Sequence, residues 1–135
     1  FGVVSIINMY PDDAKKLLFY YYKKWYGKEL GVNSNNPFIL SEKDNHYLSV
    51  IFNSEDIKND YLTLKQTLKN YGVSIPTLYK NYVELCYKEG VHFLNFGIDE
   101  DFGNCIDGFI MLDLHYITED KKKRYFTLAQ ETEVS

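Results

Sequence analysis

The aromatic content constrains the fold of this chain more than any other feature of the sequence. Its 135 residues include 13 Tyr, 9 Phe and 1 Trp, so 17% of them are aromatic. Aromatic rings must therefore make up much of the buried surface. Tyrosine also suits positions where the ring packs against apolar groups while the hydroxyl at its end contacts water. Hydrophobic residues at 45% and charged residues at 25% are ordinary globular usage. The length predicts one core, belonging to a single domain or part of one.

Charge, cysteine content and hydropathy narrow the class of protein. A net charge of -4 and a pI near 5.3 argue against nucleic acid binding, which needs many cationic groups. Cys86 and Cys105 are too few for a disulfide framework, which predicts free thiols in a reducing compartment. The longest uncharged apolar run, about eight residues, is far below the roughly 20 that span a bilayer. We therefore expect a soluble or peripheral protein.

Apolar periodicity and breaker residues predict an α/β or α+β fold in which strands and helices form layers. Residues 47–52 are ambiguous, because a short apolar run fits either a strand or a helical turn. In the first half of the chain we expect a strand over 1–10, a helix over 12–27, a surface loop over 28–36 and a helix from the Ser54 cap to Gly72. A further helix is expected from Ser74 to a left-handed cap at Gly90, followed by strands over 91–96 and 109–116 joined by an acidic turn over 97–108. The chain is expected to end in a weakly helical tail from Thr118 that is frayed over 126–135.

The acidic turn raises the question of a metal site. It places four carboxylates between Asp99 and Asp107. A calcium loop needs oxygen ligands at positions 1, 3 and 5, a Gly at 6 and a Glu at 12, yet position 5 here is Gly103. We therefore favour a structural turn or a substrate-shaping loop, and predict no metal.

The histidines and cysteines offer only weak catalytic candidates. Asp113 and His115 are two apart in a predicted strand and so share a face, which fits either a general base or a plain polar pair. His92 in a strand and His46 in a loop have no metal-ligand spacing. Cys86 is expected in the core. Cys105 is the better nucleophile, although nothing nearby in sequence would lower its pKa.

One basic cluster occurs, Lys121 to Arg124, followed by Tyr125 and Phe126. It fits either a solvated helix end or a contact with anionic lipid headgroups. The sequence contains no glycine-rich nucleotide motif, nucleophile elbow or zinc-protease motif. Composition and spacing alone therefore lead only to an α/β domain without an assigned activity.

Four blocks of residues, in order, carry a resemblance to a known family. Residues 1–10, FGVVSIINMY, resemble an FGPVSISNxY strand, and residues 76–86, PTLYKNYVELC, resemble PTLYKQYxELC. Residues 96–113 are similar to FxVDPDFxNCIDGxxxxD, and Lys123-Arg124-Tyr125 closes the pattern. Together they resemble the C-terminal half of the hemolysin-like, ornithine-lipid or glycine-lipid N-acyltransferases of bacteria, within the GNAT superfamily.

The resemblance implies a mixed sheet flanked by helices and an activity in aminolipid synthesis. Such an enzyme moves a fatty acyl group, often 3-hydroxylated, from an acyl carrier protein or CoA thioester to an amino-acid or aminolipid amine. No covalently bound cofactor is expected. The implied partner is acyl carrier protein, and the implied location is cytoplasmic or peripheral to the inner membrane.

Site residues follow from matching positions. The resemblance implies catalytic, cleft-facing groups at Ser5, Asn8 and Tyr10. It implies substrate-binding groups at Tyr79, Tyr82, Asp99, Asp101, Asn104 and Asp107.

Two observations keep a second reading open. The glycine-containing phosphate loop of the family is missing, and the chain opens inside an apolar strand without Met, so we expect part of a longer enzyme. The alternative is a non-catalytic, immunity-type module whose aromatic surface binds a protein.

Overall fold

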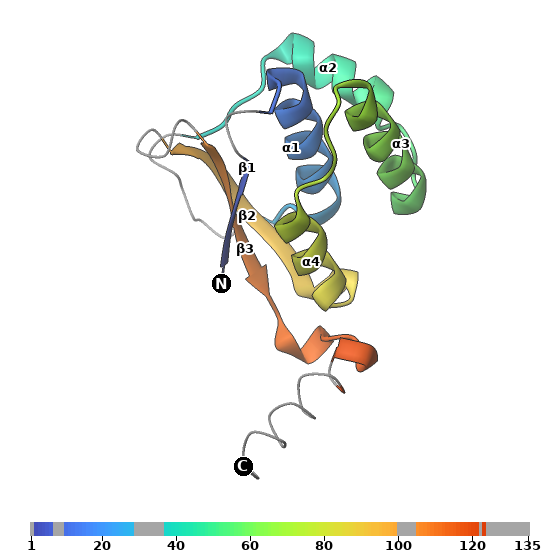
Figure 1. Ribbon diagram of the computed structural model, residues 1–135, viewed down its shortest axis with the longest axis vertical. Helices are drawn as coiled ribbons and strands as arrows, with labels where there is room; N and C mark the ends of the chain where they lie inside the picture. The colour runs from blue at the N-terminus through green and yellow to red at the C-terminus, as the bar shows by residue number, and fades with distance from the viewer. Residues whose placement is uncertain (1, 7–9, 29–36, 100–104, 122, 124–135) are drawn as a thin grey trace.

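The computed structural model describes residues 2–6, 10–28, 37–99, 105–121 and 123. A three-stranded sheet lies beside a layer of helices, so the fold is α+β, as predicted, and is consistent with a GNAT-like arrangement (Figure 1). In chain order the elements are β1 (Gly2–Ile6), α1 (Asp12–Tyr26), α2 (Glu42–Ile51), α3 (Ile57–Asn70), α4 (Thr77–Leu85), the 3-10 turn η1 (Lys88–Gly90), β2 (Val91–Asp99), β3 (Cys105–Leu112) and the 3-10 turn η3 (Leu114–Tyr116).

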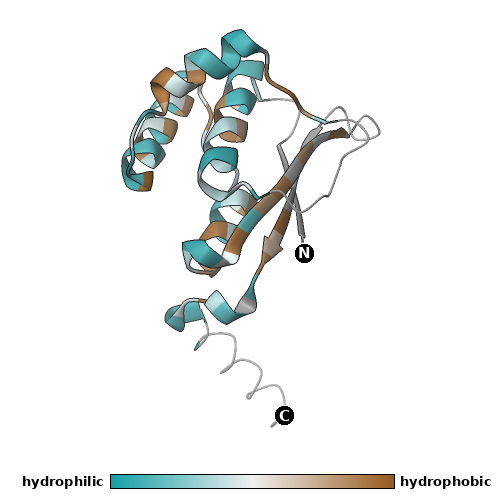
Figure 2. Ribbon diagram, turned by 180° about the vertical axis from the view of Figure 1, so that it is seen from behind, coloured by the Kyte–Doolittle hydropathy of each residue, from teal (hydrophilic) through white to brown (hydrophobic). Residues whose placement is uncertain are grey.

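β3 is the central strand of the sheet. The strand order is β1-β3-β2 and both pairings are antiparallel, with Ser5 opposite Asp107 and Gly97 also opposite Asp107. A register shift between Phe93 and Asn95 interrupts the β2 ladder. Hydrophobic residues gather along β2 and β3, whereas the helices alternate hydrophobic and hydrophilic residues (Figure 2).

The outer edge of β2 is covered by the chain that leaves α1. Gly27 forms an isolated parallel bridge with Phe93, and the Lys28 amide donates to the Phe93 carbonyl at 2.9 Å. Further on, Phe38 N donates to Phe96 O at 3.0 Å. This edge therefore has one parallel bridge, Gly27 to Phe93, and one antiparallel bridge, Pro37 to Gly97, whereas β1, β3 and β2 pair with one another in antiparallel fashion.

The core is built largely from rings, as the composition requires. The predicted helix over 12–27 is confirmed by α1, which packs between the sheet and α3 (Figure 1). Phe19 of α1 meets Phe38 and Phe96 edge to face, with ring centroids 4.9 and 4.8 Å away. Tyr22 and Tyr79 are fully buried, and the Phe93 ring lies 5.1 Å from Tyr22 and 5.7 Å from Tyr79.

The ambiguous run over 47–52 is helical, so the strand alternative is wrong. Ser41 caps α2 by accepting from the Asp44 amide at 3.1 Å. Leu48 and Phe52 are buried, whereas Tyr47 and Val50 are more than half exposed, which is one helical face rather than a strand buried on both sides. His46 consequently lies in this helix and not in a loop.

Two predicted caps differ from the structure. Asp56, rather than Ser54, caps α3, and its side chain accepts from Lys58 N. Gly90 is not a left-handed cap, because α4 already ends at Leu85; the described glycine with positive φ is Gly72, at 73°, just after α3. Helix α4 ends early because Cys86 turns extended and bridges Ile117.

The strand boundaries also shift. β2 continues to Asp99, and β3 runs from Cys105 to Leu112 rather than over 109–116, so the predicted turn is shorter than expected. His115 belongs to η3 rather than to a strand. Residues 119–121 are helical, in agreement with the weakly helical tail, and the expected fraying over 126–135 lies outside the described residues.

Candidate functional site

Three of the predicted site residues meet at one end of the sheet. Ser5 on β1 and Asp107 on β3 are register partners, and Asp99 ends β2 opposite Cys105. The fold brings these positions together because the β2–β3 connection and the C-terminal end of β1 lie at the same end of the ladder. Asn8, Asp101 and Asn104 lie outside the described residues, as do the other residues from 100 to 104 of the predicted acidic turn.

Tyr79 and Tyr82 lie elsewhere, on α4. Tyr79 is fully buried beneath β3, where its hydroxyl would be 3.3 Å from a Cβ placed on Gly108. Gly108 therefore leaves the space that the Tyr79 hydroxyl and the Phe96 ring occupy. Tyr82 is half-buried and packs against the edge of the core. In the described structure Tyr79 is a core residue, with no exposed surface to offer a substrate.

Tyr10, which lies just before α1, contacts the segment before α4. Its hydroxyl donates to the Ser74 carbonyl at 2.8 Å. Partial burial raises the pKa of the Tyr10 hydroxyl, so at neutral pH this group is a hydrogen-bond donor rather than a base. Tyr10 thus stands beside a surface depression that the sequence did not indicate.

That depression is a groove between α3 and α4, which we call the α3–α4 groove. It consists of two adjoining hollows that share Tyr61 and Leu62. The tyrosine hollow, of about 480 Å³, is also lined by Tyr21, Tyr22, Tyr26, Ile57, Lys58, Val83 and Glu84. The lysine hollow, of about 700 Å³, is also lined by Lys65, Gln66, Lys69, Val73, Ser74, Ile75, Thr77, Lys80 and Asn81.

Tyr22 places a buried polar atom beneath the lining of the tyrosine hollow. Its hydroxyl is buried and, among the described residues, has no hydrogen-bond partner. Burial is also the main reason that the pKa of the Tyr22 hydroxyl is raised, so the group stays protonated. The hydroxyl is therefore a protonated group buried behind the aromatic lining of the hollow.

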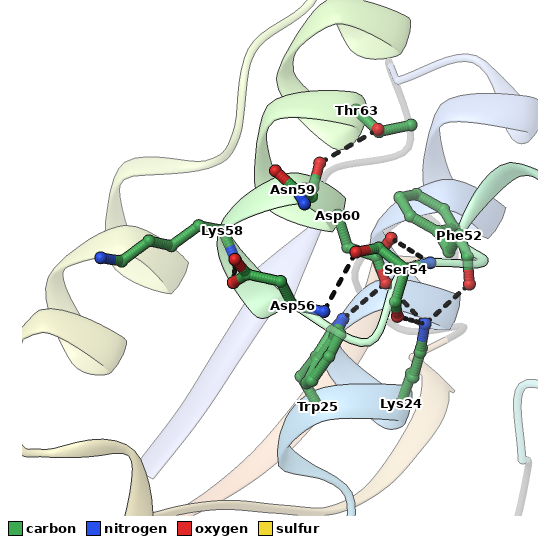
Figure 3. A network of polar contacts seen from close by, with 9 residues as sticks. All are labelled: Lys24, Trp25, Phe52, Ser54, Asp56, Lys58, Asn59, Asp60 and Thr63. Carbon is green, nitrogen blue, oxygen red and sulfur yellow. Dashed lines mark hydrogen bonds and ion pairs between the residues drawn. The ribbon is translucent and has the colours of Figure 1, made fainter.

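The orientation of α3, one wall of the groove, is fixed by a polar network around Asp60 (Figure 3). Asp60 is 1% exposed and accepts from Lys24 Nζ at 2.6 Å and Trp25 Nε1 at 2.9 Å. Lys24 also donates to the carbonyls of Phe52 and Ser54. Two residues of α1 thereby hold the first turn of α3 in place.

The remaining polar candidates do not assemble a catalytic centre. His115 Nδ1 lies 3.3 Å from Asp113 Oδ1, but its side chain is 89% exposed, which fits the polar pair rather than the general base. Cys86 is a buried free thiol, as expected, and burial raises its pKa. Within the described ranges, no group of three or more His, Cys, Asp or Glu side chains is placed to hold a metal ion.

In the part of the chain that the structure describes, each helix is too short or too polar to cross a membrane.

Comparison with known proteins relates the chain to acyltransferases. It is similar to two proteins named glycine N(alpha)-acyltransferase, from Bacteroides thetaiotaomicron with 27% identity and from Phocaeicola vulgatus with 25% identity, each over 126 residues. The alignments cover 93% of this chain but 36% and 38% of the relatives, so the chain spans little more than a third of their length. No protein-family model and no solved structure matches.

Proposed function

We propose that this chain forms part of an N-acyltransferase that moves a fatty or 3-hydroxy fatty acyl group from a thioester to the amine of an amino acid. The observation that carries the proposal is the similarity to the two glycine N(alpha)-acyltransferases along 93% of the chain. Glycine is accordingly the first acceptor to test. We further propose an acyl carrier protein thioester, or acyl-CoA, as donor, and aminolipid synthesis at or near the inner membrane as the setting.

The reaction sets clear demands on the site. The uncharged amine attacks the thioester carbonyl, the new C–N bond forms, and the C–S bond breaks to release a thiol. A base or water chain takes the amine proton, and hydrogen-bond donors stabilise the oxyanion. We assign oxyanion donation to Tyr10: its hydroxyl stays protonated, and on binding the thioester it would turn from the Ser74 carbonyl to the thioester oxygen. Ser5 and Asp107 are register partners on adjacent strands and are the second polar position in the proposal.

The test is acyl transfer by the complete gene product that carries these residues. Labelled glycine is incubated with a 3-hydroxyacyl thioester of acyl carrier protein or of CoA, and N-acylglycine is measured by mass spectrometry. We expect Tyr10→Phe to lower kcat/KM by about a hundredfold, the usual cost of removing one oxyanion donor. Tyr87→Phe is the matched control, since Tyr87 is half exposed and lies beyond α4.

Two results would count against the proposal at different levels. Unchanged kcat/KM in Tyr10→Phe and in Asn8→Ala would remove both residues from the site. A folded wild-type protein that acylates neither glycine nor other amines with either thioester would overturn the acyltransferase itself. The protein-binding module would then be the better description.

A further inference from the structure

The exposed charge of α3 is entirely positive. The helix carries Lys58, Asp60, Lys65 and Lys69, and its single carboxylate, Asp60, is buried against Lys24 and Trp25. The lysines are solvent exposed. A chain of net charge -4 thus presents a locally cationic helix, because the fold removes the only compensating charge from its surface.

The lysine hollow collects this charge around an apolar floor. Lys65 and Lys69 from α3 and Lys80 from α4 line it, and Asp and Glu are absent from its lining. Within the described structure none of the three forms an ion pair; Lys65 Nζ instead lies 5.4 Å from the Tyr61 ring centroid. Their charges are consequently available to a ligand.

Apolar surface is exposed in the same groove. Leu62, where the two hollows meet, is 52% exposed, and Val73 and Ile75 line the lysine hollow. The tyrosine hollow continues this surface, and its lining holds one lysine and one carboxylate, Lys58 and Glu84. The groove is therefore apolar along its length, strongly positive at one end and nearly neutral at the other.

We propose that the α3–α4 groove binds an amphipathic helix of another protein, with acidic residues facing Lys65, Lys69 and Lys80. A groove between two helices receives a third helix through anchors at i, i+3, i+4 and i+7. The concave apolar floor, with Leu62 at its centre, takes those anchors, and the charge gradient fixes the direction of the helix. A flat anionic bilayer would touch the lysines but leave the tyrosine hollow unfilled.

The binding step is tested without any thioester, so its failure is distinguishable from failure of the proposed acyl transfer. The probe is a labelled synthetic helical peptide with leucines on one face and glutamates on the other, followed by fluorescence anisotropy and by amide NMR shifts of the protein. We expect shifts confined to α3, α4 and residues 73–75. Affinity is expected to fall steeply with salt, because exposed charges are screened.

Charge reversal supplies the decisive comparison. Combined Lys65→Glu, Lys69→Glu and Lys80→Glu substitutions are expected to weaken peptide binding at least about tenfold, since charge complementarity is inverted. The matched control reverses Lys28, Lys43 and Lys88, three exposed lysines outside the groove, and should change affinity less than about twofold. Circular dichroism checks that both variants fold.

A second pair of variants tests the apolar floor and needs no charge change. Leu62→Ser should weaken binding severalfold, whereas Val50→Ser, at a similarly exposed site on α2, should not. The proposal is overturned if the wild type does not bind the acidic peptide, if a lysine-for-glutamate peptide binds equally well, or if both triple variants lose equal affinity. Binding to phosphatidylglycerol vesicles but not to the peptide would assign the groove to a membrane surface instead.

Discussion

At the scale of single residues, one buried carboxylate organises much of the helical layer. Asp60 accepts from Lys24, Trp25 and the Ser54 amide, and so joins α1, the loop after α2 and the start of α3. The apolar stripe of α3 was predictable from its spacing. The role of Asp60 was not predictable, because its two side-chain partners, Trp25 and Lys24, are 35 and 36 residues away and only the tertiary fold brings them close.

Asp60→Ala should therefore destabilise the fold. It leaves the Trp25 and Ser54 donors without their acceptor and Lys24 without its counterion. Because the Lys24 side chain is 28% exposed, water can solvate its ammonium group in place of the lost carboxylate. We therefore expect the free energy of unfolding in urea to fall by about 2 kcal/mol. Glu55→Ala, five residues earlier and exposed before the start of α3, is the control. A loss within about 0.5 kcal/mol would show that the network adds no stability.

At the scale of elements, the predictions failed where long-range pairing overrides local signals. Cys105 to Gly108 has the composition of a turn, yet it forms half of β3 because strands on both sides pair with it. Helix α4 stops before its apolar pattern ends, since Tyr87 N and Thr118 N join the 116–118 segment to its end. The helix predicted over 12–27 is confirmed because its pattern is strong and local, whereas the strand predicted over 1–10 is described only as β1 over Gly2–Ile6, and Tyr10 lies outside it.

Gly90 tests this tertiary control of an element end. A Cβ at this position would lie 2.5 Å from Tyr116 Cβ and 3.0 Å from the Asp113 carbonyl, so η1 and η3 would have to separate. We expect Gly90→Ala to cost about 1 to 3 kcal/mol, as overpacking does. Glu89→Ala, exposed in the same turn, should be close to neutral in calorimetry. An unchanged melting temperature for Gly90→Ala would mean that the two turns are not packed as described.

At the scale of the whole molecule, the sequence predicted the fold class but not the strand order or the groove. The α+β class follows from the succession of patterns, whereas the β1-β3-β2 order depends on which strands meet in space. The aromatic excess is used mainly in the core, as expected. The lysine hollow could not be predicted from the net charge of the chain, because that sum does not contain the positions of the individual charges in the fold.

The pH dependence of global stability should report His92. Partial burial on β2, with Lys28 and Lys88 nearby, lowers its pKa, although Asp113 and a backbone hydrogen bond at Glu89 oppose the shift. The unfolded state then binds a proton more readily, so stability falls as the pH drops below about 6.5. His92→Gln should reduce the decline in urea unfolding free energy between pH 7.5 and 5.5, values that bracket the ordinary histidine pKa of about 6.5. Parallel pH profiles for wild type and variant would contradict this assignment.

Because residues 27–28 and 37–38 cover the outer edge of β2, a further strand can join the sheet only at its other edge, beside β1. A new strand cannot hydrogen-bond where the chain already occupies the edge. Among the described residues no strand pairs with the far side of β1, so any segment that extends the sheet joins there. The strand that carries Ser5 would then become an interior strand, and the polar end of the sheet would lie at a seam between two pieces of polypeptide.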